Sequence, residues 1–206
     1  MTSSEKYIIS LSLNGKLNFW NLDSLSDNKL PDLVLNGHQH YVSKAVYNKN
    51  NSTVISSDCS GKLRKQLSLK IVQWDSNKNA TVVHNLHSSK IITISLSCDN
   101  QIIYSLDSDL NLIGFDLNSS TKIFSTKLTS GEAQVIQSSR TNPQIVYVLY
   151  SNSLTVVNNG KVEAQHSLSF TAKSFAASEN ELFFGDRVFF YSHRMVFYMF
   201  MITALH

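Results

Sequence analysis

The amino-acid sequence predicts an all-β fold built from repeated sheets, and three observations support this prediction. The chain has 206 residues, of which 42% are hydrophobic and 16% charged, so it contains enough apolar material for a packed core. Runs rich in Val, Ile and aromatic residues are separated by Ser and Asn, which is typical of short strands joined by turns. A pattern also recurs at a period near 40 residues, which is typical of a four-stranded unit.

One stretch shows the repeat most clearly. It opens with Gly37 and His38, continues through strand-like runs at 41–42 and 53–57, and ends with Trp74 and Asp75. A Gly-His start and a Trp-Asp end with strands between them form the signature of a WD-type blade, the repeating unit of one class of β-propeller. The stretch therefore predicts one propeller blade.

The next unit begins at His87 and ends at Asp116, with Phe115 in the Trp position. These two ends are 29 positions apart, whereas His38 and Asp75 are 37 apart. Removing residues 63–70 makes the two spacings equal. We therefore expect 63–70 to be an insertion into a β-turn, either a surface loop or an unspliced coding segment, the latter favoured because it splits a short hairpin.

Three further segments fit the repeat less completely. Residues 7–21 align with the second half of a blade whose first half is missing, and Trp20 matches Trp74. Residues 144–158 form a degenerate blade with Val157 in the Trp position. A fifth unit starts near Phe170 and stops at Asp186. The sequence predicts a partial WD-repeat β-propeller of about four blades over residues 1–186. Residues 187–206 are expected to be a hydrophobic tail outside the repeat pattern. Its apolar run, Met195 to Leu205, is shorter than the ~20 residues needed to cross a membrane.

Each complete blade is expected to bury a hydrogen-bonded network of His, Ser or Thr, Asp and Trp, because a polar group buried without a partner costs about 1–3 kcal/mol. Six residues are the candidates: His38, Ser56 and Trp74 in one blade, and His87, Ser105 and Asp109 in the next. Ser60 occupies the Asp position of the first of these blades. The predicted role of all six is structural.

Two sharper interpretations compete with this structural one. The pairs His38 with His40 and His84 with His87 have spacings that can bind one metal ion, and Asp107, Asp109 and Asp116 could serve acid–base chemistry. The histidines already have positions at repeat starts, and Asp is favoured at turns for local hydrogen bonds. With no phosphate-binding loop or nucleophile elbow in the sequence, we expect no metal, no cofactor, no small-molecule substrate and no enzymatic activity.

Charge and cysteine content bound the environment of the chain. The net charge is +3, and the Lys and Arg residues are scattered, so nucleic acid is not an expected partner. The chain has two cysteines and its first residues do not resemble a signal peptide, which favours the cytoplasm.

The strand and turn at residues 7–18, Pro31, the run 35–38 and the blade ending in Trp74 and Asp75 together resemble the actin-interacting, cofilin-partner family of WD-repeat proteins. The resemblance covers about residues 7–186 without the insertion and falls at the start of that family's second propeller. It implies a fragment of a protein with two linked seven-bladed propellers that binds actin filaments with cofilin and promotes their disassembly. It matches no partner-binding residue to a position here.

Two other outcomes stay open. The chain could be a WD-repeat adaptor of another complex, such as a ubiquitin ligase or a trafficking complex, or a truncated gene product without function. An open set of blades leaves strand edges unpaired, so we expect the isolated chain to be poorly soluble.

Overall fold

A computed structural model describes residues 7–21, 30–36, 38, 40–50, 53–58, 69–74, 80–129, 131–179, 181–188 and 196–203. Every regular element in these ranges is a β-strand, which confirms the all-β prediction. The chain divides into two compact units, residues 1–91 and 92–206, which are described separately.

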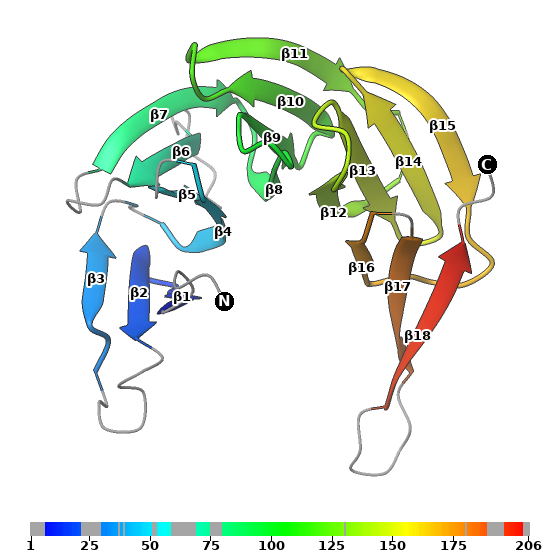
Figure 1. Cartoon of the computed structure of the whole chain (residues 1–206), viewed down its shortest axis with the longest axis horizontal. Coiled ribbons are helices and arrows are strands. Elements are labelled where there is room, and N and C mark those ends of the chain that lie inside the picture. Colours follow the sequence, from blue (N-terminus) through cyan, green and yellow to red (C-terminus); the bar gives the residue numbers. More distant parts are fainter. Residues whose placement is uncertain are drawn as a thin grey trace. The chain divides into compact units, whose positions relative to one another are not determined.

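The first unit contains two antiparallel sheets (Figure 1). Their strands are β1 (Tyr7–Leu11), β2 (Lys16–Asn21) and β3 (Leu33–Asn36) in one sheet, and β4 (Val42–Asn48), β5 (Thr53–Asp58), β6 (Leu69–Trp74) and β7 (Ala80–His87) in the other. Leu17 and Leu35 of the three-stranded sheet pack against Val42 and Val54 of the four-stranded sheet. The core of this unit therefore lies between the two sheets.

The second unit contains three sheets (Figure 1). They consist of β8 (Ile91–Leu96), β9 (Ile102–Asp107), β10 (Asn111–Asp116) and β11 (Thr121–Lys127); β12 (Ala133–Ser138), β13 (Ile145–Tyr150), β14 (Ser153–Asn158) and β15 (Lys161–Ser167); and β16 (Ser174–Ala177), β17 (Glu181–Val188) and β18 (Val196–Thr203). In every sheet each strand pairs with the next along the chain. Successive four-stranded meanders of this kind are the blades of a β-propeller, so the predicted fold class, partial and propeller-like, is confirmed.

Strand β13 shows why these sequences form doubly covered sheets. Val146 and Val148 belong to a core cluster that also holds Leu106 and Leu112, whereas Leu149 belongs to another cluster with Phe184. Successive strand residues point to opposite faces, so alternate apolar positions bury both faces of the β12–β15 sheet. Its continuous apolar run is the reason the degenerate blade still folds as one.

The turn after β14 depends on a glycine. Gly160 has φ +80°, and a Cβ added there would lie 2.6 Å from Cγ of Phe124. Only glycine combines this left-handed backbone conformation with such a close approach. The turn therefore fixes where β15 begins beside β11.

The two incomplete sheets are longer than the sequence predicts. Residues 7–21 were expected to be half a blade, but with β3 they form three strands. The expectation that no strand follows Asp186 is wrong: β17 continues to Val188, and all eight residues of β18 pair with it. The predicted tail thus supplies a strand. Its composition differs from that of the repeat, but strand pairing uses backbone groups, which every residue in β18 provides.

Strand register locates the extra residues in the second sheet. Ser56 pairs with Val72, sixteen positions later, whereas Ser105 pairs with Ile113, eight positions later. The difference of eight equals the length of the predicted insertion at 63–70. Residues 63–68 lie outside the described residues, and the β6–β7 register shifts at each side of Lys70 before regular pairing begins.

Candidate functional site

The sheet topology brings the candidate residues to one end of each sheet. In an antiparallel meander, the start of the first strand, the end of the second, the start of the third and the end of the fourth lie at the same end of the sheet. We call this end the loop end. In the β4–β7 sheet it holds His38, which precedes β4, and Ser56 and Asp58 near the end of β5.

These three side chains form a hydrogen-bonded chain. Nδ1 of His38 lies 3.0 Å from Oδ2 of Asp58, and Nε2 of His38 lies 2.7 Å from Oγ of Ser56. The order Ser–His–Asp is that of a hydrolytic triad. However, Ser56 is fully buried, so a substrate cannot reach its hydroxyl from solvent. The arrangement pairs both ring nitrogens of the buried His38 with polar side chains and thereby stabilises the sheet.

The predicted network is therefore only partly as expected in this blade. His38 and Ser56 are hydrogen-bonded to each other, but the carboxylate comes from Asp58, two residues after Ser56. Ser60 and the side chain of Trp74 lie outside the described part of the chain. The sequence pattern places the acid of the network in the turn, whereas Asp58 is the last residue of β5.

The next blade has the same spacing. Asp107 follows Ser105 by two positions and both are fully buried, while the predicted member Asp109 is exposed. The Asp107 carboxylate accepts hydrogen bonds from the backbone N–H of Asn111 at 2.8 Å and of Asp109 at 3.0 Å. The predicted member Asp109 is thus exposed to solvent, and Asp107 is the buried carboxylate of this hairpin. His87 is buried but belongs to the first unit, so its place in a hydrogen-bonded network with Ser105 stays a prediction.

The first sheet contains a related pair that sequence reasoning missed. Nε1 of Trp20 donates a hydrogen bond to Oγ of Ser10 at 2.9 Å. Trp20 pairs with Ile8, just as Trp74 pairs with Val54, so Ser10 and Ser56 each lie two residues beyond the partner of a Trp. This register was the signal that could have identified Ser10.

The metal and acid–base alternatives find no assembled site. Among the described residues, no three His, Cys, Asp or Glu side chains gather as a metal site would require, and the side chain of His84 is outside them. Asp107 ends β9 at the β9–β10 turn, whereas Asp116 ends β10 at the other end of this hairpin. Backbone hydrogen bonds from Ser119 and Asn118 lower the pKa of Asp116, which is the behaviour of a turn-capping carboxylate.

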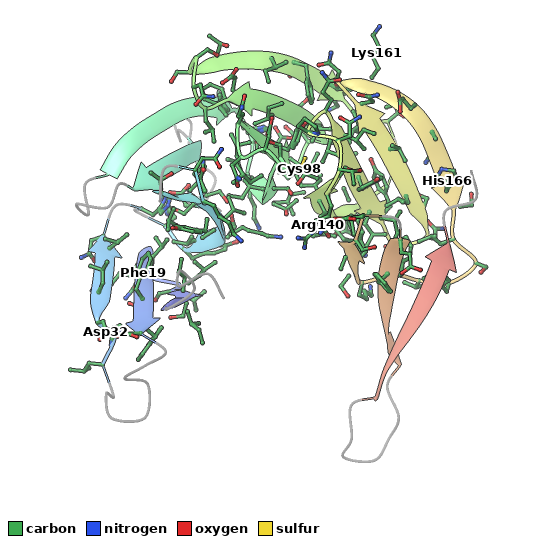
Figure 2. All side chains as sticks on the ribbon, viewed as in Figure 1. Phe19, Asp32, Cys98, Arg140, Lys161 and His166 are labelled. Atoms are coloured by element: carbon green, nitrogen blue, oxygen red, sulfur yellow. The ribbon has the colours of Figure 1, made fainter. Side chains whose placement is uncertain are left out.

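An open pocket of about 430 Å³ lies at the loop end of the β12–β15 sheet. Three segments form it: the residues entering β12, the β13–β14 turn, and the end of β15. The lining residues are Gly131, Glu132, Tyr150, Ser151, Asn152, Ser153, Gln165, Ser167 and Leu168. Lys161 and His166 mark the two ends of β15, and the pocket lies at the His166 end (Figure 2).

No protein-family model and no curated protein matches the chain.

A membrane-spanning helix is not found in the parts of the chain that the structure describes. A cation–π contact lies near the loop end of the β4–β7 sheet, where Nζ of Lys90 is 5.7 Å from the centre of the Tyr41 ring. Such an exposed cation over an aromatic ring is worth about 0.5–1 kcal/mol.

Proposed function

We propose that the chain is a non-catalytic protein-binding module that contacts its partners through the loop ends of its sheets. The single observation that carries this proposal is the pocket at the loop end of the β12–β15 sheet, which is open and polar. The groups with the pattern of a hydrolytic triad are buried instead, so the proposal assigns them to stability. A binding function uses the open surface and leaves the buried network intact.

The partners we propose are actin filaments and cofilin, in the cytoplasm. The support is the resemblance carried by residues 7–18, Pro31, 35–38 and the Trp74-Asp75 pair. In that family, filament binding with cofilin leads to disassembly. The proposed role is therefore that of a cofactor in cofilin-dependent disassembly, with no covalent step.

Co-sedimentation tests the proposal. The full chain is mixed with bare filaments, with cofilin-decorated filaments, and with buffer alone to measure pelleting by aggregation. We expect more of the chain in the pellet with decorated filaments than with either control, and faster loss of filaments. A chain that stays in the supernatant with decorated filaments would overturn the actin assignment, and the adaptor of another complex or a gene product without function would then be favoured.

A further inference from the structure

The pocket at the loop end of the β12–β15 sheet has an uneven charge. Among its lining residues, Glu132 is the only one with a formal charge at neutral pH, and it is exposed. Among the residues that the structure describes, no Lys or Arg lines the pocket. An anionic ligand would therefore meet a like charge, and a cation would meet an opposite one.

The neutral lining residues add hydrogen-bond acceptors. Ser151, Asn152 and Gln165 bring hydroxyl and amide oxygens to the same space as the Glu132 carboxylate. Alternation along β15 turns Gln165 and Ser167 into the pocket and His166 to the opposite face of the strand. The site thus combines one carboxylate with several neutral acceptors.

The walls of this pocket are held in place. The backbone N–H of Leu168 donates to the carbonyl of Asn152 at 2.8 Å, that of Ala172 donates to the carbonyl of Ser151 at 2.8 Å, and Nε2 of Gln134 donates to Oγ of Ser151 at 2.9 Å. The β13–β14 turn is therefore tied to the segment that follows β15. A pre-formed wall reduces the entropy lost when a ligand binds.

We propose that this pocket binds an arginine side chain of a partner protein, with Glu132 as its counter-charge. A guanidinium group is planar, always charged and carries only donors, so it can satisfy a carboxylate and neutral oxygens at once. The volume lies at the small end of the range for ligand pockets, roughly 300–1,000 Å³, which suits one side chain and its flanking backbone. The inference rests on the proposed binding function and names the chemistry of the partner.

The test uses the isotope-labelled full chain and four acetylated, amidated tripeptides, Gly-Arg-Gly, Gly-Lys-Gly, Gly-Gln-Gly and Gly-Glu-Gly, followed by NMR. We expect the arginine peptide to cause saturable shifts at Gly131, Glu132 and Asn152. Glu132→Gln should weaken its binding by about three- to fivefold, because a charge pair at an exposed carboxylate is worth up to about 1 kcal/mol. Glu163→Gln, which removes the same charge from a residue of β15 outside the pocket lining, should change it by less than about twofold.

Equal shifts with the glutamine or glutamate peptide, or undiminished binding by Glu132→Gln, would overturn the arginine assignment. If Glu132→Gln loses the dispersed amide spectrum of a folded sheet, Gln165→Ala replaces it, with weaker binding of the arginine peptide expected and unchanged binding overturning the assignment. The co-sedimentation assay separates the two proposals. A chain that pellets with decorated filaments but binds none of the peptides keeps the function and loses the pocket, while the reverse result keeps the pocket and loses the filament partner.

Discussion

Asp107 and Asp109 stand two residues apart in one hairpin but have opposite environments. Asp107 is fully buried and caps the turn through hydrogen bonds to two backbone N–H groups, whereas Asp109 is exposed. We expect Asp107→Ala to lower the free energy of unfolding by about 1–3 kcal/mol, because it leaves two part-buried backbone N–H groups without their acceptor. Asp109→Ala should stay within about 0.5 kcal/mol of the wild type. Urea denaturation of both variants checks this, and equal losses would contradict the assignment of Asp107.

The buried Tyr104 makes the free energy of unfolding vary with pH in the alkaline range. Its ring is fully buried and its hydroxyl donates to the carbonyl of Pro143. Burial, with a further contribution from the nearby Asp99 carboxylate and Cys98, raises the pKa of Tyr104 well above the ordinary 10.0. The folded state therefore favours the neutral phenol, so this contribution is complete below pH 10.0 and is lost progressively as the pH rises above it.

The Tyr104→Phe variant isolates this effect. At pH 7 we expect it to cost about 1 kcal/mol of unfolding free energy, since one hydrogen bond is lost. Above pH 10, the stability of the wild type should fall more steeply than that of the variant, because only the wild type must ionise this phenol on unfolding. Parallel pH dependences measured by denaturant unfolding would show that Tyr104 ionises as an exposed tyrosine does.

At the scale of elements, the β5–β6 hairpin carries the clearest prediction. Deleting residues 63–70 would bring Ser56 and its pairing partner in β6, Val72, to the same separation in sequence as Ser105 and Ile113. We expect the deletion to be tolerated and to stabilise the chain by ~0.5–1 kcal/mol, because a shorter loop costs less entropy to close. Thermal unfolding measures this. Deletion of residues 67–74 is equal in length but removes all of β6, whereas the 63–70 deletion removes only its first two residues, which precede the regular β6–β7 pairing. The 67–74 deletion should abolish cooperative unfolding, and a similar loss in the 63–70 variant would contradict the prediction.

The strands show which elements the sequence can and cannot reveal. Alternating apolar residues and turn signals predicted β13, the Ser151-Asn152 turn and β14, even with Val157 in the Trp position. Strand β18 was missed because its composition differs from the repeat, while its pairing depends on the backbone of β17. The acids Asp58 and Asp107 were missed because register, which sequence spacing does not show directly, decides which Asp is buried.

The pocket marks a further limit of sequence reasoning. Its lining comes from three segments between Gly131 and Leu168, and none of them carries a recognisable motif. Only the antiparallel order of β12 to β15 brings Glu132, Asn152 and Gln165 to the same end of the sheet. A site assembled by topology from Ser, Asn and Gln residues is therefore visible only once the sheet is built.

At the scale of the whole molecule, the first sheet leaves an apolar strand at its edge. Strand β1 ends the order β1-β2-β3, and its residues Ile8 and Leu11 are 48% and 39% exposed. An exposed apolar edge strand is a template for pairing with another chain. We therefore expect the isolated chain to self-associate as its concentration rises.

A charge on the edge strand should suppress this association. Ile8→Lys places an ammonium group where another strand would pair, so sedimentation velocity should show fewer oligomers and a weaker dependence on concentration than for the wild type. Leu30→Lys is the matched control, because Leu30 is 76% exposed but lies outside the strands, and it should leave association unchanged. Equal effects of the two variants would assign self-association to general hydrophobicity. A wild-type chain that stays monomeric and melts cooperatively at every concentration would show that β1 does not recruit a second chain.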